Sequence, residues 1–241
     1  MSRDSKLAPV LAVVGGAIVL VVALVVALQL SHNSKKSGSI ATDSIAEMLS
    51  GIPQKGIELG NPKAKLTLVE FSDPQCPWCG RWARDTFPSL VQNYVRTGEL
   101  RIEYRGVNVI DNPATGATDS DRMIRLAQAA GLQNKLWNVV ELEFENQATE
   151  GSGYATDPFL RGIADAVGPA FDAGKAISVS NTNAVLPMMN AAQKLAAAKI
   201  GKRLSTPTFV IGPTGSTKTV TIVGAQPLSA FTQAIDAQLK K

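Results

Sequence analysis

The stretch KLTLVEFSDPQCPWC, residues 65–79, contains the features that decide the fold. Its first half is rich in the β-branched and aromatic residues that are typical of a buried strand. The segment after Cys79, residues 81–95, has the amphipathic spacing of a helix that bends at Pro88. A strand that leads into a helix through CPWC is expected to put the sulfur of Cys76 at the helix N-terminus.

Cys76 and Cys79 are the only two cysteines among the 241 residues. At a helix N-terminus, unpaired backbone N–H groups and the positive end of the helix dipole stabilise a thiolate. The thiolate is the reactive form of cysteine, and its stability therefore controls the reactivity of the pair. The pattern predicts a redox-active dithiol, and with it a thiol–disulfide oxidoreductase.

Composition limits the other chemistry that is open to the chain. The single histidine, His32, falls in the polar segment after the apolar N-terminus, so the folded domain has no Cys–His or Ser–His pair. A zinc site needs more ligands than two cysteines supply, unless two chains pool their CPWC motifs. The net charge of +4 comes without a basic stripe interleaved with aromatic residues, so no nucleic-acid binding is expected. We expect no metal and no cofactor beyond the redox-active Cys76–Cys79 disulfide.

The N-terminal segment is apolar and uncharged. Between Leu7 and Leu28 it contains only Leu, Val, Ile, Ala, Gly and one Pro. At about 1.5 Å per residue this stretch is about 33 Å long, enough to cross a hydrocarbon core of about 30 Å. A cleaved signal peptide is the alternative, but its apolar core is usually about 7–15 residues and no Ala-x-Ala pattern closes this one. We predict a transmembrane anchor over residues 7–30, after a cytoplasmic tail at 1–6.

A polar segment follows the anchor. Residues 31–58 are predicted to form a tether, interrupted by a short helix near 44–50. Residues 59–241 then have a normal size for one domain with a single core. Basic residues flank the anchor on both sides, so the positive-inside rule does not settle its orientation. Because a disulfide-forming pair works best outside the reducing cytosol, we expect a single-pass cell-membrane protein with an extracytoplasmic catalytic domain.

The elements beyond the first helix follow a recognisable order. A strand at 99–110 completes a strand–helix–strand unit, which implies a parallel pair with a right-handed crossover. Further elements are expected in this order: helices at 121–130 (with Ser120 as the N-cap), 133–146, 157–167 and 184–202, strands at 208–211 and 220–223, and a helix at 227–239. The result is an α/β, thioredoxin-like fold with a helical subdomain inserted at about 113–203, preceded by one transmembrane helix.

Two motifs in this order carry a family resemblance. FSDPQCPWC at 71–79 and STPTF at 205–209, separated by the helical insertion, resemble the DsbA-like thiol:disulfide oxidoreductases, in particular the membrane-anchored forms of Gram-positive bacteria. The resemblance covers about residues 55–240. It implies that Cys76 is the exposed nucleophile and that Cys79 is the buried resolving thiol.

The resemblance also implies roles for residues around the dithiol. Pro207 matches the cis-proline that faces the active site, and Thr206 would present backbone groups to an extended substrate; a trans proline that opens a strand is the alternative. Glu70 matches the acidic residue beneath the active site. Burial would raise its pKa and let it relay a proton to or from Cys79. The alternative for Glu70 is a strand glutamate that points to solvent.

The residues between the cysteines, Pro77 and Trp78, are expected to support the site. Many DsbA-type oxidases carry histidine where this chain has Trp78, and histidine stabilises a thiolate better than tryptophan does. We expect the pKa of Cys76 to lie above that of the most oxidising relatives, yet below the free value of about 8.5. Trp78 is either an apolar contact for unfolded substrates or a partly exposed packing residue.

The leading hypothesis is a membrane-tethered enzyme that donates its disulfide to unfolded or reduced secreted proteins. The family implies reoxidation by a quinone-linked membrane partner of the DsbB or VKOR type. A reductase or isomerase on the same fold is the alternative; because no dimerisation domain is evident, we expect a monomer. A non-catalytic peptide-binding or chaperone module with a structural Cys76–Cys79 bond has less support, since a bridge over two intervening residues adds little stability.

Overall fold

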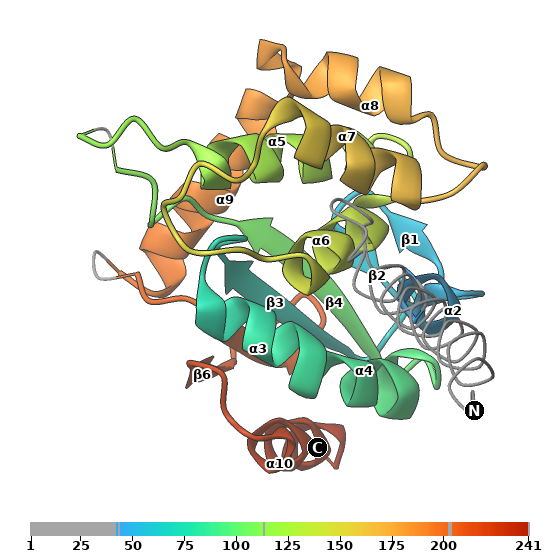
Figure 1. Cartoon of the computed structure of the whole chain (residues 1–241). Helices are drawn as coiled ribbons and strands as arrows, with labels where there is room; N and C mark the ends of the chain where they lie inside the picture. The colour runs from blue at the N-terminus through green and yellow to red at the C-terminus, as the bar shows by residue number, and fades with distance from the viewer. Residues whose placement is uncertain (1–41, 43, 113, 202–203, 241) are drawn as a thin grey trace, which may run out of the picture. The chain divides into compact units, whose positions relative to one another are not determined.

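A six-stranded mixed sheet forms the centre of the folded domain (Figure 1). The computed structural model describes residues 42, 44–112, 114–201 and 204–240, all within one unit of the chain, Ile40–Lys241. The predicted cytoplasmic tail and transmembrane anchor lie outside the described residues. None of the helices in the described part is both long enough and apolar enough to cross a membrane.

The strand order is β1-β2-β4-β3-β5-β6, with β3 parallel to β4 and every other neighbouring pair antiparallel. The strands are β1 (Gln54–Lys55), β2 (Glu58–Leu59), β3 (Leu66–Ser72), β4 (Leu100–Gly106), β5 (Thr208–Pro213) and β6 (Val220–Val223). β3 lies in the centre because its side chains pack on both faces: most are buried, and the rest are half-buried. The predicted strand–helix–strand unit and the closing hairpin are both confirmed.

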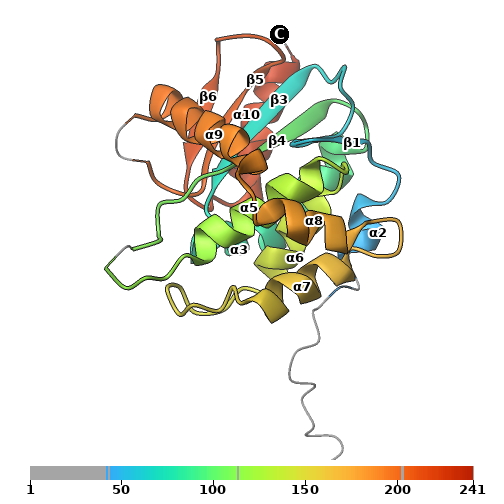
Figure 2. The same ribbon diagram turned by 90° about the horizontal axis from the view of Figure 1, so that it is seen from above.

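Helices cover both faces of this sheet and form the insertion between β4 and β5 (Figures 1 and 2). They are α2 (Ile45–Leu49), α3 (Pro77–Asp85), α4 (Phe87–Leu90), the π-helical turn η1 (Val91–Val95), α5 (Asp119–Gly131), α6 (Leu136–Glu145), α7 (Asp157–Ala166), α8 (Ala173–Ser180), the 3₁₀ turn η2 (Asn183–Val185), α9 (Leu186–Lys199) and α10 (Leu228–Leu239). Figure 2 shows α5, α6, α7 and α8 gathered beside the sheet, as predicted for an inserted helical subdomain.

The two faces of the sheet pack against different helices. On one face, the ring of Trp82 in α3 lies 4.5 Å from Phe209 and 5.9 Å from Phe231 of α10, so α3, β5 and α10 share one aromatic cluster. On the other face, Ala196 of α9 packs with Phe71 and Val210 in a smaller cluster. Removing an aromatic side chain from such a core costs about 3–5 kcal/mol.

The folded domain begins earlier than residue 59. Ile45 and Leu49 of α2 are buried in the main core, and Leu59 of β2 pairs with Ile102 of β4. The expected short helix near 44–50 is present, but it belongs to the domain. The end of the predicted tether at residue 58 is therefore wrong, because its second half supplies core residues, the helix α2, the strand β1 and the start of β2.

The helices differ from expectation in detail. The helix at 81–95 divides after Asp85, because Pro88 has no N–H to donate to the preceding turn. The segment at 133–146 starts later, after a turn in which Asn134 has a φ of 57°. Thr118, not Ser120, is the N-cap position of α5. α8 and the two-residue strands β1 and β2 were not expected, since they are too short or too rich in small residues to show periodicity.

Candidate active site

The dithiol stands where β3 leads into α3. Cys76 is the N-cap residue of α3, with extended backbone angles, and Pro77 occupies the first turn, where a backbone N–H would have no partner in the helix. Both cysteines are free thiols. Cys79 is 0% exposed, as expected, but Cys76 is only 6% exposed. The expected openly exposed nucleophile is therefore wrong: the sulfur of Cys76 lies against the Thr206 carbonyl and is largely covered.

The two sulfurs have opposite electrostatic environments. The pKa of Cys76 is lowered to about 6, first by a hydrogen bond from the Cys79 thiol and then by Thr206 and by the backbone N–H groups of Cys79 and Trp78. Burial raises the pKa of Cys79 well above its ordinary value, and the neighbouring Cys76 sulfur raises it further. Cys76 is thus a thiolate at neutral pH while Cys79 keeps its proton. The prediction of a Cys76 pKa below 8.5 is confirmed.

The segment before β5 closes over Cys76. The peptide bond between Thr206 and Pro207 is cis, as the resemblance implied. In its protonated form the Cys76 thiol donates to the Thr206 carbonyl across 3.4 Å, and the Pro207 carbonyl accepts from the backbone N–H of Gly224 at 2.8 Å. Thr206 is half-buried and Pro207 is buried, so this loop presents backbone groups directly beside the reactive sulfur.

Glu70 lies behind the dithiol on β3, where its register partners are Tyr104 on β4 and Phe209 on β5. It is 0% exposed, and within the described residues neither carboxyl oxygen has a hydrogen-bond partner of normal geometry. Burial raises its pKa to about 8, so the carboxyl holds a proton at neutral pH. The expected burial is confirmed, and the solvent-pointing alternative is excluded.

Ser72 lies on the same face of β3 as Glu70, and the sequence analysis did not identify it. Its side chain lowers the pKa of both Glu70 and Cys79, against the larger opposite effect of burial. Among the described residues the Ser72 hydroxyl has no hydrogen-bond partner of normal geometry. The alternation of side chains along β3 could have indicated Ser72, because residues 70 and 72 lie on the same face of the strand.

Trp78 is exposed, with 56% of its surface open. The guanidinium of Arg81 lies 5.6 Å from the centre of its ring, a cation–π geometry. Arg81 also pairs with Asp85 one turn further along α3. Trp78 is therefore not part of the core, and an indole face remains at the rim of the site.

A second buried carboxyl, which the sequence analysis missed, anchors the loop before Cys76. Asp73 accepts hydrogen bonds from the backbone N–H groups of Gln75, Val109 and Ile110 and from the Ser120 hydroxyl, at 2.6–3.1 Å. Gln75 extends the network to the insertion: its side-chain amide donates to Asp111 and Ser120, and its side-chain oxygen accepts from the N–H of Gly151, each at 2.8 Å. Ser120, expected to cap α5, instead joins this helix to the dithiol loop.

Gln147, just after α6, holds the same loop from the other side. Its amide donates to the carbonyls of Pro74 at 2.7 Å and Cys76 at 3.0 Å. A Cβ atom at Gly80 would collide with the Gln147 side chain, so the close approach requires glycine there. The partners lie 71 or more residues apart in the chain, and no local pattern predicts them.

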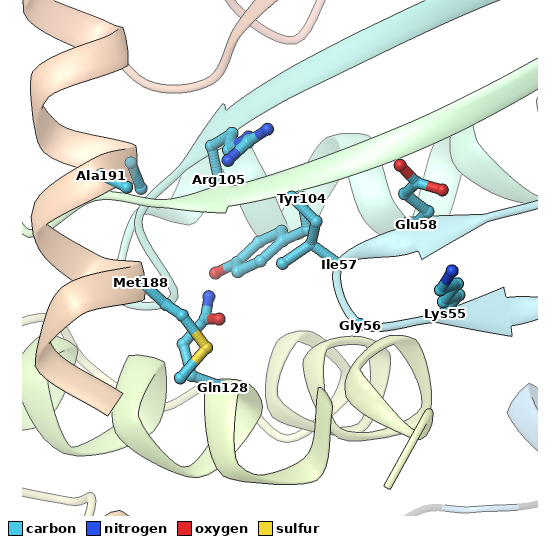
Figure 3. A pocket seen from close by; sticks show the side chains of 10 residues that line it. Lys55, Gly56, Ile57, Glu58, Tyr104, Arg105, Gln128, Met188 and Ala191 are labelled. Atoms are coloured by element: carbon cyan, nitrogen blue, oxygen red, sulfur yellow. The ribbon is translucent and has the colours of Figure 1, made fainter. Parts of the chain in front are cut away.

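Tyr104 borders the site from β4. It is completely buried, and among the described residues its hydroxyl has no hydrogen-bond partner. Burial raises its pKa well above the ordinary value, and the charges of Glu143, Glu70, Asp73 and Cys79 raise it further. Tyr104 lines a pocket of about 400 Å³ between the β1–β2 turn, α5 and α9. Figure 3 shows its hydroxyl pointing toward Gln128 and Met188. The described part of the chain contains no group of three or more His, Cys, Asp or Glu placed to hold a metal ion.

Comparisons with known proteins agree with this geometry. A family model described as Thioredoxin matches residues 53–237. "Probable disulfide bond formation protein D" of Bacillus cereus is 26% identical over 147 residues, which cover 60% of this chain and 61% of that protein, so the match spans less than two thirds of the relative.

Solved structures show the same fold. The crystal structure of alpha-DsbA1 from Wolbachia pipientis superposes with a TM-score of 0.63 at 19% identity, covering 80% of this chain and 92% of that chain. A thioredoxin-like oxidoreductase from Silicibacter pomeroyi gives a TM-score of 0.58 at 26% identity, with 81% and 98% covered.

Proposed function

The chain belongs to the thioredoxin family, and from that membership we propose that it is a thiol:disulfide oxidoreductase that donates its Cys76–Cys79 disulfide to other proteins. The observation that carries the proposal is the opposition between the two sulfurs: the pKa of Cys76 is lowered to about 6, while that of Cys79 is raised well above its ordinary value. A thiol with a low pKa is a good leaving group, so disulfide transfer runs toward the substrate.

The reaction follows from this asymmetry. A substrate thiolate attacks the sulfur of Cys76, the Cys76–Cys79 bond breaks, and its electron pair leaves on Cys79. Cys79 takes a proton, because its buried position disfavours the thiolate. A second substrate thiolate then attacks its partner in the mixed disulfide, and Cys76 leaves as a stable thiolate. Two substrate thiolates are oxidised to a disulfide, and the protein takes up two electrons and one proton.

Glu70 supplies that proton in this proposal. Its carboxyl is protonated at neutral pH, and the neighbouring Ser72 side chain affects the pKa of both Glu70 and Cys79. Thr206 supports substrate binding, because its carbonyl beside Cys76 is placed to meet an extended peptide backbone. The exposed indole of Trp78 offers an apolar contact at the rim for a substrate that is not yet folded.

Exchange with a reduced test protein checks the proposal. The oxidised chain is expected to introduce disulfides into the test protein, and Cys76→Ser is expected to abolish transfer. Cys79→Ser is the matched variant: it has no disulfide to donate and should not oxidise the test protein either. When it is mixed with the oxidised test protein, the Cys76 thiolate should attack a substrate disulfide, and the mixed disulfide should accumulate because the resolving thiol of Cys79 is absent. Transfer that persists in Cys76→Ser would contradict the proposal, as would the absence of this trapped species in Cys79→Ser.

We further propose that the chain works at the outer side of a membrane on secreted proteins, and that a quinone-linked membrane partner reoxidises it. The uncharged apolar stretch at 7–28 and the preference of disulfide formation for oxidising compartments support this proposal. Alkaline carbonate extraction of membranes from cells that express the full chain is the test. The protein should stay with the membrane pellet, and its release into the supernatant would contradict the proposed anchor.

A further inference from the structure

A pocket of about 400 Å³ lies between the β1–β2 turn, α5 and α9 (Figure 3). We call it the Tyr104 pocket, after the residue on β4 that lines its buried end. Neither cysteine lines it, and the proposed disulfide exchange uses none of the residues that do. Its volume lies in the range of about 300–1,000 Å³ that small-molecule sites in proteins have. The Tyr104 pocket is therefore large enough for a ligand of its own.

The buried end of the Tyr104 pocket is polar. Tyr104 is 0% exposed, and its hydroxyl has no hydrogen-bond partner among the described residues. Gln128 of α5 is 2% exposed and lines the same pocket, and Figure 3 shows the hydroxyl pointing toward it. Buried polar groups in native proteins are nearly always hydrogen-bonded. The Tyr104 hydroxyl is thus free to bond a molecule that enters the pocket.

The wall that the β1–β2 turn supplies is held by hydrogen bonds. The carbonyl of Ile57 accepts from the backbone N–H of Tyr104 at 3.1 Å and from the indole N–H of Trp137 at 3.0 Å. The backbone N–H of Gly56 donates to the side chain of Asn134 at 3.1 Å. Because these bonds fix the turn, a ligand would meet a pocket that is already formed and would not have to order a loop.

The charged residues that line the pocket are Lys55, Glu58 and Arg105. Glu58 forms an ion pair with Arg101 at 3.4 Å. Arg105 forms one with Glu103 at 2.8 Å, and its side chain points to the opposite face of β4 from that of the residue before it. Lys55 is exposed. None of these charges is therefore placed to meet a ligand group at the buried end.

A neutral ligand with an aromatic body fits the buried end. Neither Tyr104 nor Gln128 is charged at neutral pH, because burial raises the pKa of the Tyr104 phenol well above its ordinary value and an amide does not titrate. A charged group bound between them would have no counter-charge, at a high cost in free energy. Ile57 and Met188 supply apolar surface, and a thioether makes favourable contacts with aromatic rings.

We propose that the Tyr104 pocket binds a small uncharged ligand with an aromatic body and a carbonyl group that accepts hydrogen bonds from the Tyr104 hydroxyl and the Gln128 amide. A carbonyl oxygen has two lone pairs, so this one atom can accept from both side chains. The ring then packs against Ile57 and Met188. The inference does not depend on the proposed function, because it uses neither thiol.

Benzamide is the probe, because it is uncharged and combines one ring with one carbonyl. It is titrated into the full chain in detergent micelles, with the methyl groups of the protein's five methionines labelled with ¹³C for NMR. The methyl resonance of Met188, assigned with Met188→Leu, should shift and saturate. The resonance of Met48, which lines a different pocket, should not move. If the Met188 resonance does not respond, the pocket takes up water alone and the inference fails.

Two related compounds test the chemistry of the ligand. Toluene keeps the ring but has no acceptor, so it should bind at least about tenfold more weakly than benzamide, the difference that one hydrogen bond makes. Benzoate has the shape of benzamide and a negative charge, and it should also bind at least about tenfold more weakly. Equal affinity for toluene would show an apolar cavity without a polar site, and tighter binding of benzoate would show an anion site. Either result would overturn the inference.

Variants of the lining residues test the location of the site. Tyr104→Phe removes only the hydroxyl and should weaken benzamide binding about tenfold. Ala191→Trp fills the pocket from an exposed position on α9 and should abolish binding. Ala198→Trp is the matched control and should leave the affinity unchanged, because Ala198 is exposed two turns further along α9 and does not line the pocket.

The inference is overturned if Ala191→Trp binds benzamide as the unaltered chain does, or if Tyr104→Phe keeps full affinity. The methyl spectrum without ligand shows whether each variant folds. If Tyr104→Phe does not fold, Gln128→Leu takes its place with the same expected loss, and the comparison of Ala191→Trp with Ala198→Trp decides the location.

Discussion

Asp73 and Glu70 are buried carboxyls at the same end of β3, three positions apart, yet their surroundings are opposite. Asp73 accepts three backbone N–H groups and one hydroxyl. Within the described chain, Glu70 has no hydrogen-bond partner of normal geometry for either oxygen. Burial raises the pKa of both, but hydrogen bonds oppose this at several points around Asp73 and only through Ser72 at Glu70.

This difference in hydrogen-bond donors gives the two buried carboxyls of the site different functions. A carboxyl that is surrounded by donors fixes the loops that carry those donors, and it cannot leave them without a large loss of stability. A carboxyl without donors prefers to keep its proton, and it can give that proton to a neighbour that needs it more. Asp73 therefore holds the loop on the Cys76 side of the site in place, and Glu70 is suited to give a proton on the Cys79 side.

Removing Asp73 should have the largest effect on stability. Asp73→Ala leaves the N–H groups of Val109 and Ile110 and the Ser120 hydroxyl without their acceptor, and each buried orphan costs about 1–3 kcal/mol. We expect the free energy of unfolding in urea at pH 7 to fall by about 4 kcal/mol. Asp119→Ala is the matched control; it frees only the N–H groups of Gly153 and Ala155 and should cost about half as much. Equal losses of stability in Asp73→Ala and Asp119→Ala would contradict the stabilising function assigned to the donors around Asp73.

Removing Glu70 should change the pH dependence of stability. The pKa of Glu70 is raised in the folded protein to about 8 from an ordinary value of 4.5, so the unaltered fold loses stability as pH rises between these values. Glu70→Gln has no proton to lose. Between pH 5 and pH 8, its stability relative to the unaltered chain should rise by about 3 kcal/mol, measured by urea unfolding. A constant difference across this range would show that Glu70 does not titrate as described.

Substitution of Gln147 tests the contacts on the Cys76 side of the site, and we expect a smaller loss of stability. Gln147→Ala leaves the carbonyls of Pro74 and Cys76 without their side-chain donor, and we expect a loss of about 1–2 kcal/mol. Gly80→Ala should cause a similar loss, because the added Cβ displaces the Gln147 side chain. The two losses should therefore not add in the double variant, which urea unfolding can measure. Full additivity would mean that Gly80 and Gln147 act separately.

The local sequence pattern was enough to predict those elements of the fold whose apolar residues recur with a clear period. The β-branched run of β3, the helix that starts after Cys76 and the hairpin of β5 and β6 were predicted with small errors in their ends. The strands β1 and β2 have two residues each, so they show no alternation, and their place in the sheet depends on pairing with β4. The tether boundary was misplaced for the same reason.

For the site, the sequence identified the residues that act chemically but not those that hold them. Cys76, Cys79 and Pro207 stand in motifs, and Glu70 was identified by its match to the acidic residue of the DsbA-like family. Asp73 lies inside the motif at 71–79, yet two of its donors, the N–H groups of Val109 and Ile110, lie 36 and 37 residues further along the chain. The burial of Cys76 was missed because the covering carbonyl of Thr206 lies 130 residues along the chain.

The equilibrium reduction potential of Cys76–Cys79, titrated against glutathione in the full chain, tests the central claim most directly. If the lowered pKa of Cys76 makes the pair a disulfide donor, the potential should lie between about −120 and −180 mV, the range of DsbA and protein disulfide isomerase. A value near the roughly −270 mV of thioredoxin would make the chain an electron donor and contradict the account.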